Sequence, residues 1–437
     1  MNLSLYTHLF SANGRYYLFN SLTLLFAEIS EELYRRLGDG SYADYSEEIL
    51  NELREQQIIM EKERLYDYYY GRLTQSLRKH FNPNVLSLIL VPTTGCNLAC
   101  PYCFEPKKNP RTMTDETIGD LLDSIKNNVN LKEIRLSWYG GEPLMAFPQI
   151  KKIWEGLNQD GMPKIISHSI VTNGVLLDEE KIRFFKEAKL DSMQITLDGA
   201  KERHDSLRCF KNGGAGTYNC ILANIDKVVE IYPDLPLNIR VNIDHENWKD
   251  YVTVKKMLAE RYPNSKVGAY EGYLRIDNAD KTQLCHPSIS KEEHLDMIRK
   301  FRASGIKESL FPSMTERGCM MQSDNAIIVG PEGEIYKCWN DVSDPDRVTG
   351  HIKNPKIGNP SLQLRYMHGC TPFNAECREC GVFPICDGGC CLQRYRNMYE
   401  GGNYDVCSPY KDKEKLKEAL LNGDFNLDSS KREETAQ

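Results

Sequence analysis

Three cysteines stand close together early in the chain. Cys96, Cys100 and Cys103 form a CxxxCxxC triplet directly after an apolar segment, Leu86–Val91. Closely spaced thiolates suit zinc or an iron–sulfur cluster. A structural zinc site normally has four closed ligands, and no fourth Cys or His is adjacent in the sequence. The triplet therefore favours a cluster with one open iron over a zinc site or three buried cysteines without a metal.

A second set of cysteines lies in the last third of the chain. It follows the pattern Cx13Gx4C, a gap, Cx2Cx5Cx3C, a gap and a final C. Its members are Cys319, Cys338, Cys377, Cys380, Cys386, Cys390 and Cys407. The Cx2C part alone is compatible with a zinc ribbon. Because a reducing cytoplasm does not maintain disulfides, the chain's 15 cysteines indicate metal ligands or catalysts.

The composition is that of a folded globular protein. The chain has 437 residues, of which 41% are hydrophobic and 27% charged, so two or three domains are expected. The net charge of −7 has the wrong sign for a protein whose main partner is nucleic acid. No apolar stretch approaches the length that spans a bilayer, and no export signal is visible. We therefore expect a cytoplasmic protein with no nucleic-acid and no membrane partner.

The elements that must position these cysteines fall into four expected segments. Residues 1–84 predict a hairpin turning at Asn13 and Gly14, followed by two helices, at Ser21–Leu37 and Tyr45–Gln57. This strand pair with short helices is similar to a winged-helix arrangement.

Residues 85–304 alternate apolar runs with helical periods, which predicts parallel βαβ units in an open sheet or a barrel. The expected strands are 86–91, 134–138, 167–171, 193–197, 238–242 and 266–276, with helices such as 115–129 and 178–188 between them. Residues 305–410 are rich in Cys, Gly and Pro, as in a domain held by metal. Residues 411–437 predict a charged helix and a disordered tail.

The cluster triplet resembles that of the radical S-adenosylmethionine superfamily, in which a CxxxCxΦC loop holds a [4Fe-4S] cluster. Tyr102 occupies the aromatic Φ position. The resemblance extends over the βα region, because polar or glycine-containing motifs follow four successive predicted strands, where barrel enzymes place their active sites. It implies a partial (β/α)6 barrel, within an α/β fold that also has the N-terminal α+β domain and the C-terminal Cys-rich domain.

The same resemblance implies which residues bind S-adenosylmethionine. Gly140, Gly141 and Glu142 belong to a GGEP motif, whose glycines let the backbone approach the cofactor and whose acid contacts its ammonium group. Asn173 lies in the motif after the third strand. In related maturases a Ser or Thr and an Arg twelve positions later hold the cofactor's carboxylate, and Thr196 and Arg208 have this spacing. Each residue taken alone could equally be a turn glycine, a cap or a surface charge.

The seven later cysteines match the SPASM extension of radical enzymes that modify peptides and proteins. By this resemblance Cys377, Cys380, Cys386 and Cys407 hold one auxiliary [4Fe-4S] cluster. A second auxiliary cluster takes Cys319, Cys338 and Cys390, which makes three clusters in the chain. Its fourth site is either open, so that it could bind a substrate thiolate, or closed by Cys285, Cys370 or Cys391.

The resemblance implies a maturase of a ribosomally made precursor peptide, whose leader sequence the N-terminal domain would capture by strand addition. Hydrogen abstraction by the cofactor's radical would lead to a thioether or other side-chain cross-link, with flavodoxin or ferredoxin as reductant. The alternatives are a sulfatase-type maturase that makes formylglycine, another modification such as epimerisation, and a non-catalytic peptide-binding protein. Sulfatase maturases carry Asp after the cysteine that matches Cys338, where this chain has Trp339. Spacing marks no residue as the general base.

Overall fold

The computed structural model describes residues 1–103, 109–213, 216–244, 247–273, 291–316, 318–353, 358–370 and 374–423. The chain forms two compact units, and each combines segments that are distant in sequence. One unit contains Met1–Lys79, Ser290–Gln322 and Tyr366–Gln437, and the other contains His80–Ile289 and Ser323–Arg365. We call these the peripheral unit and the barrel unit.

The barrel unit is built on a nine-stranded sheet with the order β11-β10-β9-β8-β7-β6-β12-β13-β14. The first six strands of this unit are mutually parallel. They are β6 (Val85–Leu90), β7 (Glu133–Trp138), β8 (Lys164–Thr172), β9 (Ser192–Thr196), β10 (Leu237–Ile243) and β11 (Val267–Tyr273). Six parallel strands joined by helices confirm the α/β fold class expected from the sequence.

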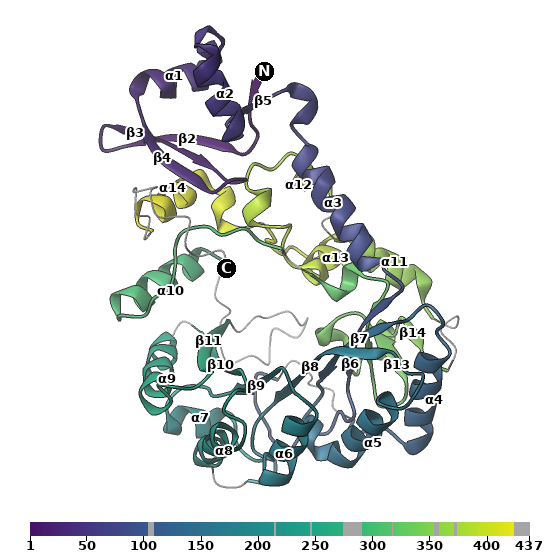
Figure 1. Ribbon diagram of the computed structural model, residues 1–437. Helices are drawn as coiled ribbons and strands as arrows, with labels where there is room; N and C mark the ends of the chain where they lie inside the picture. Colours follow the sequence, from purple (N-terminus) through teal and green to yellow (C-terminus); the bar gives the residue numbers. More distant parts are fainter. Residues whose placement is uncertain are drawn as a thin grey trace. The chain divides into compact units, whose positions relative to one another are not determined.

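Helices connect the parallel strands and lie along the outer side of the sheet (Figure 1). They are α4 (Asp115–Lys126), α5 (Phe147–Leu157), α6 (Glu179–Glu187), α7 (Lys201–Leu207), α8 (Tyr218–Ile231) and α9 (Trp248–Arg261). The side chains of Thr114 and Asp178 cap α4 and α6 by accepting hydrogen bonds from the backbone amides of Thr117 and Lys181. These caps are why the two helices begin where the sequence pattern places them.

Three short strands from residues 326–351 extend this sheet beyond β6. They are β12 (Ala326–Val329), β13 (Glu334–Tyr336) and β14 (Gly350–His351). β12 pairs in parallel with β6, and β13 and β14 continue in antiparallel fashion. The first part of the Cys-rich segment is therefore joined to the barrel sheet by backbone hydrogen bonds.

The peripheral unit begins with a three-stranded antiparallel sheet of β2 (Thr7–Ala12), β3 (Arg15–Asn20) and β4 (Leu25–Ile29). The expected turn is confirmed, because Asn13 and Gly14 both have positive φ, as a tight hairpin requires. The expected helix at Ser21–Leu37 is wrong in its first half. Residues 25–29 instead pair with β3, and Ser30 caps a shorter helix, α1 (Glu31–Asp39).

Apolar side chains cover both faces of the β2-β3-β4 sheet. Leu18 packs on one face against Leu37 of α1 and Leu53 of α2 (Glu47–Glu55). Phe19 and its neighbours pack on the other face with the C-terminal residues Val382, Ile385, Leu416 and Leu420. The remaining elements of this unit include β1 (Asn2–Leu3), β5 (Ile59–Met60), α3 (Asp67–His80), α10 (Lys291–Ala303), α12 (Ala375–Arg378), α13 (Cys391–Tyr399) and α14 (Lys413–Leu421). α11 (Pro360–His368) lies where the chain passes between the units.

The expected C-terminal helix is confirmed as α14, whereas the expected disordered tail and Cys285 lie outside the described residues. Among the helices that the structure describes, none is both long and apolar enough to cross a membrane.

Candidate active site and cluster sites

The CxxxCxxC loop follows β6 and is held by backbone hydrogen bonds at both ends. Thr94 donates to the carbonyl of Arg111 on one side. On the other side Ala99 donates to the carbonyl of Cys209, and Leu98 forms a β-bridge with Phe210. Burial raises the pKa of the Cys100 thiol to about 11, so a metal has to displace this proton to bind.

The two glycines of the GGEP motif lie against the backbone of this loop. A Cβ atom on Gly141 would lie 2.2 Å from the carbonyl oxygen of Gly95, and one on Gly140 would lie 2.4 Å from that of Thr93. Gly140 also has a φ of +133°, which side chains disfavour. In addition, the amide of Glu142 donates to the Gly95 carbonyl at 2.8 Å. The glycines therefore allow β7 to support the cluster loop directly.

The carboxylate of Glu142 is fully buried and joins three loops. It accepts hydrogen bonds from the Thr172 hydroxyl at 2.7 Å, the Asn173 amide at 2.7 Å and the Leu144 amide at 3.0 Å. Burial raises the pKa of this carboxyl, and the hydrogen bonds oppose the rise. The Asn173 side chain extends from the same place toward the cluster loop, donating to the Asn97 side-chain oxygen at 2.7 Å and lying 4.0 Å from the Cys96 sulfur.

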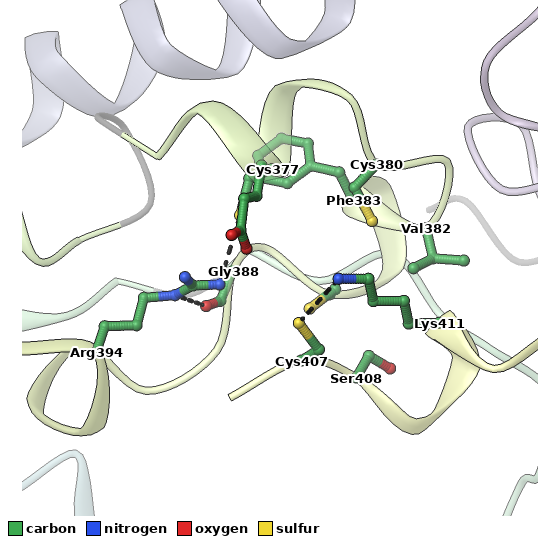
Figure 2. A pocket seen from close by; sticks show the side chains of 11 residues that line it. Cys377, Cys380, Val382, Phe383, Gly388, Arg394, Cys407, Ser408 and Lys411 are labelled. Atoms are coloured by element: carbon green, nitrogen blue, oxygen red, sulfur yellow. Dashed lines mark hydrogen bonds between the residues drawn. The ribbon is translucent and has the colours of Figure 1, made fainter. Parts of the chain in front are cut away.

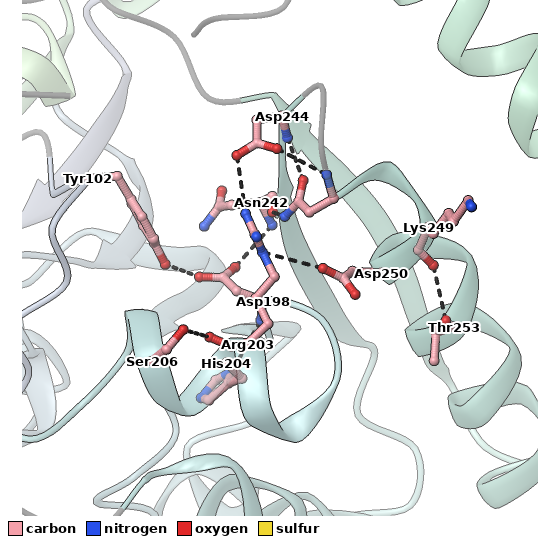
Figure 3. A network of polar contacts seen from close by, with 11 residues as sticks. Tyr102, Asp198, Arg203, His204, Ser206, Asn242, Asp244, Lys249, Asp250 and Thr253 are labelled. Carbon is pink, nitrogen blue, oxygen red and sulfur yellow. Dashed lines mark hydrogen bonds and ion pairs between the residues drawn. The ribbon is translucent and has the colours of Figure 1, made fainter. Parts of the chain in front are cut away.

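Tyr102, in the Φ position, meets two groups at the ends of later elements. Its hydroxyl donates to the buried carboxylate of Asp198, which follows β9, as Figure 3 shows. The same hydroxyl accepts a hydrogen bond from the Arg208 guanidinium at 2.9 Å. Arg208 also lies 3.8 Å from the Asp198 carboxylate. The structure thus brings together Tyr102 of the cluster loop and Arg208, two residues expected to bind the cofactor.

His204 belongs to this site but was not predicted from the sequence. Its Nδ1 accepts from the backbone amide of Asp198 at 3.1 Å, so Nε2 carries the proton and donates to Thr217. The Thr217 hydroxyl then donates to the carbonyl of Arg208 at 2.7 Å. Burial, with the charge of Arg208, lowers the pKa of His204 to about 3, so the imidazole is neutral. The one feature of the sequence that points to His204 is its position four residues before Arg208.

Two buried polar atoms in this region have no partner among the described residues, and both suit a zwitterionic ligand. They are Nε of Arg208 and Nδ2 of Asn97. Because Nη1 of Arg208 is occupied by Tyr102, Nε belongs to the side of the guanidinium that is left for a carboxylate. Beside Cys96 and Asn97 there is a pocket of about 570 Å³, also lined by Met145, Phe210 and Lys211. These residues fit S-adenosylmethionine next to the cluster loop. Thr196 ends β9 and is buried.

Four cysteines of the second set surround a small pocket in the peripheral unit, shown in Figure 2. Cys377, Cys380, Cys386 and Cys407 all line it. These are the four ligands that the sequence assigned to the first auxiliary cluster, and the chain brings them to one place. Four thiolates around one pocket suit a closed [4Fe-4S] cluster.

Two cationic side chains donate to these sulfurs. Arg394 lies 3.5 Å from Cys377, and Lys411 lies 3.5 Å from Cys407. Positive donors at thiolate sulfurs stabilise the reduced, more negative state of a cluster. Within the part of the chain that the structure describes, no three His, Cys, Asp or Glu side chains already converge closely enough to hold a metal ion. The ligand assignments therefore depend on spacing and on the shared pocket.

Of the remaining predicted ligands, Cys319 and Cys390 belong to the peripheral unit, and Cys338 belongs to the barrel unit. Trp339, which follows Cys338, packs edge-on against Tyr139 with ring centres 4.2 Å apart. Tyr139 directly precedes the GGEP glycines. An indole therefore occupies the position directly after Cys338, where the resemblance to sulfatase maturases leads us to expect an aspartate.

A partial barrel with a three-cysteine loop and a buried arginine beside it defines an enzyme that cleaves S-adenosylmethionine, and comparison with known proteins agrees. Residues 90–258 match the Radical SAM superfamily. A serine-type anaerobic sulfatase-maturating enzyme of Bacteroides thetaiotaomicron is 34% identical over 74% of this chain and 87% of its own length. The chain belongs to this family of radical S-adenosylmethionine maturases, enzymes that act on peptide or protein substrates.

Two solved structures share the fold. The structure of anSMEcpe with bound AdoMet and the Cp18Cys peptide has a TM-score of 0.59 at 22% identity, covering 77% of this chain and 98% of that one. Streptococcus suis SuiB bound to S-adenosylmethionine has a TM-score of 0.53 at 14% identity, covering 93% of this chain and 100% of that one. Membership of the family implies S-adenosylmethionine and a [4Fe-4S] cluster in this protein too.

Proposed function

We propose that this enzyme modifies a ribosomally synthesised precursor peptide and installs a thioether or other side-chain cross-link. The observation that carries the proposal is the outer edge of β4. Both faces of the β2-β3-β4 sheet are covered by apolar contacts, whereas none of the described strands pairs with the far edge of β4. An extended leader peptide can add there through main-chain hydrogen bonds.

The comparisons support a separate recognition domain. The sulfatase-maturating relative matches 74% of this chain, whereas the SuiB fold covers 93% of it. A further SuiB structure is described as bound to precursor peptide SuiA, and its TM-score with this chain is 0.51. A fold of this extent suits an enzyme that holds its peptide at an N-terminal domain while modifying it elsewhere.

The residues of the barrel unit position the reaction. Arg208 would hold the cofactor's carboxylate on its Nε side, and the loop containing Gly140, Gly141 and Glu142 would support the cofactor's amino-acid end. When bound, S-adenosylmethionine reduced through a cluster held by Cys96, Cys100 and Cys103 would supply the radical that removes a hydrogen atom from the peptide. Forming a thioether breaks one C–H and one S–H bond and makes one C–S bond. The thiol hydrogen would leave as a proton, and the remaining electron would pass to an auxiliary cluster.

Formylglycine formation is the second candidate function, because the 34% identical relative is named a serine-type anaerobic sulfatase-maturating enzyme. The contact of Trp339 with Tyr139 argues against it, since no carboxylate stands directly after Cys338.

The test is to incubate the reconstituted enzyme with candidate peptides, S-adenosylmethionine and flavodoxin or dithionite. The candidates are short Cys-containing precursors encoded near its gene and a sulfatase peptide containing Cys or Ser. A loss of two mass units with one blocked cysteine thiol in the precursor supports a thioether. An unchanged mass with an altered residue configuration indicates epimerisation. Formylglycine in the sulfatase peptide alone would replace the proposal by the second function.

A further inference from the structure

The inner face of the barrel sheet carries polar side chains on its later strands. Four residues of β10 are apolar and completely buried: Leu237, Ile239, Val241 and Ile243. Helix α9 packs on this strand, on the outer side of the sheet (Figure 1). Because successive side chains of a strand point to opposite faces, Arg240 and Asn242 lie on the inner face. There Arg240 is the cross-strand neighbour of Thr196 in β9 and of Tyr270 in β11.

The guanidinium of Arg240 is held by neutral groups. Its Nε donates to the side-chain oxygen of Asn242 at 2.9 Å. The residue of β11 that pairs with Asn242 is Gly272, and a Cβ atom there would lie 2.3 Å from the same Nε. The absence of a side chain at Gly272 thus leaves the space in which the guanidinium lies. Tyr270 interacts with the guanidinium as well and donates its hydroxyl to Gln194 at 2.6 Å.

The buried aspartates at the ends of β9 and β10 are paired with other arginines. Asp198 lies 3.8 Å from Arg208, and Asp244 lies 3.2 Å from Arg203. Asp198 reaches Arg240 through charge alone, and within the described part of the chain no carboxylate forms an ion pair with Arg240. This half-buried guanidinium has therefore lost part of its hydration without gaining a counter-ion. Its fork of N–H donors matches a carboxylate.

From this arrangement we infer that Arg240 binds an acidic side chain, Asp or Glu, of the substrate peptide. The cofactor's carboxylate is assigned to Arg208, so the carboxylate left for Arg240 is the peptide's. Because Arg240 neighbours Thr196, a residue expected at the cofactor, this contact would hold the peptide near the radical and select which residue loses a hydrogen atom. The inference rests on the proposed function for its peptide substrate and adds the charge of a residue near the modified position.

The first test needs no turnover. The probes are the α-amide of N-acetylglutamate and its neutral isostere, the α-amide of N-acetylglutamine. Each is added to reconstituted, oxidised enzyme saturated with S-adenosylmethionine, and binding is measured by saturation-transfer NMR. The variants are Arg240→Gln and Arg240→Lys, with Arg183→Gln as control, since Arg183 pairs with Glu179 within α6. Thermal unfolding shows whether each variant is folded.

We expect the glutamate probe, and not the glutamine probe, to bind to the parent and to Arg183→Gln. Arg240→Gln should bind the glutamate probe at least about 10-fold more weakly, and Arg240→Lys, which keeps the charge but not the fork, should lose less. If Arg240→Gln does not fold, Arg240→Lys against the parent decides. Equal binding of the two probes to the parent, or no loss in the Arg240 variants, would overturn the inference. An equal loss of S-adenosylmethionine affinity in Arg240→Gln and Arg208→Gln would overturn it in favour of the cofactor's carboxylate.

A peptide that the enzyme modifies gives the second test. Each Asp and Glu in it is replaced in turn by Asn or Gln. One replacement should raise KM about 10- to 100-fold in the parent and have little further effect in Arg240→Gln, because the two changes remove the same contact. If the product is formylglycine instead of a cross-link, the proposed function fails and the assignment of Arg240 stands. If the parent tolerates every replacement equally while forming the cross-link, the assignment fails and the proposed function stands.

Discussion

Gly141 lies so close to Gly95 that a Cβ atom on it would stand 2.2 Å from the Gly95 carbonyl oxygen. Because that oxygen belongs to the backbone, the clash cannot be relieved by a side-chain rotation. The contact joins the end of β7 to the loop that carries Cys96, Cys100 and Cys103. The position of the cluster loop thus depends on the absence of a side chain at a residue that binds no metal.

Gly141→Ala is therefore expected to displace the cluster loop. The variant should unfold at a lower temperature and retain less iron after reconstitution, by up to the four atoms of one cluster. Gly119→Ala is the matched control, because it lies in α4 with no heavy atom within 4 Å of its Cβ position. That substitution should stabilise the protein by about 0.5–1 kcal/mol. Equal iron content in both variants would contradict the supporting role of Gly141.

Glu142→Gln is expected to destabilise the barrel unit by about 1–3 kcal/mol, because the new amide would point a donor at one of three buried donors. The binding of S-adenosylmethionine, measured by calorimetry, should weaken as well. Glu155→Gln is the control, since Glu155 is exposed on α5 and should change stability by less than about 0.5 kcal/mol. Unfolding in urea, measured anaerobically, compares the two variants.

The neutral imidazole of His204 makes stability depend on pH. Its pKa is about 3 in the folded protein, lowered mainly by burial, and about 6.5 in the unfolded chain. A His with a lowered folded-state pKa contributes stability that is present above pH 6.5 and is lost as the pH falls toward 3. Between pH 7.5 and 5.5 this loss is about 1.4 kcal/mol.

His204→Gln should therefore lose about 1.4 kcal/mol less stability than the parent between pH 7.5 and 5.5. His168→Gln should show a similar reduction, because burial lowers the pKa of His168 to about 4. The discriminating readout is the affinity for S-adenosylmethionine, since His204 is linked through Thr217 to Arg208 and His168 contacts Trp138 in the core. Equal loss of affinity in both variants would show that His204 has only a structural role.

Lys411 donates to the Cys407 sulfur from a largely accessible position. Lys411→Met removes a positive charge and a hydrogen bond at the proposed auxiliary cluster, so the reduction potential of that cluster should become more negative. Lys417→Met is the control. Lys417 lies in α14, and its replacement removes an ion pair with Glu414 instead, so the potential should stay unchanged. A redox titration followed by electron paramagnetic resonance distinguishes them, and equal potentials in the two variants would contradict the assignment of Cys407.

The leader-binding proposal predicts a local protection pattern. Hydrogen exchange should slow at residues 25–29 of β4 when a precursor peptide with its leader is added, because its backbone would pair with that edge. A peptide lacking the leader should have no effect there, and α9 should be unchanged with either peptide. Protection spread evenly over α1 and α2 without a change in β4 would indicate a different docking surface.

The sequence was most informative where periodicity and motif coincide. Strands β6 to β10 lie within a few residues of their expected positions, because each is a buried apolar run followed by a turn. The helix predicted at Ser21–Leu37 is wrong in its first half. Its apolar spacing suits a helix, but residues 25–29 pair with β3 and form a strand.

The cysteine spacing grouped Cys377 with Cys407 despite their separation in sequence, and the structure places both at one pocket. That they ligate a cluster stays a prediction. The supporting contacts of the site near Arg208 were harder to predict. The link from Asp198 through His204 and Thr217 to Arg208 depends on how α7 returns to the end of β9. Such tertiary hydrogen bonds leave no periodic signal in the sequence.

The central claim is that the loop of Cys96, Cys100 and Cys103 holds the cluster that cleaves S-adenosylmethionine. The most direct measurement is 5′-deoxyadenosine released per chain on anaerobic reduction, together with iron content, in the parent and in Cys100→Ala, with Cys220→Ala as control. We predict about 12 iron atoms and cofactor cleavage in the parent and the control, and about 8 iron atoms without cleavage in Cys100→Ala. Deoxyadenosine release that persists in Cys100→Ala would contradict the account.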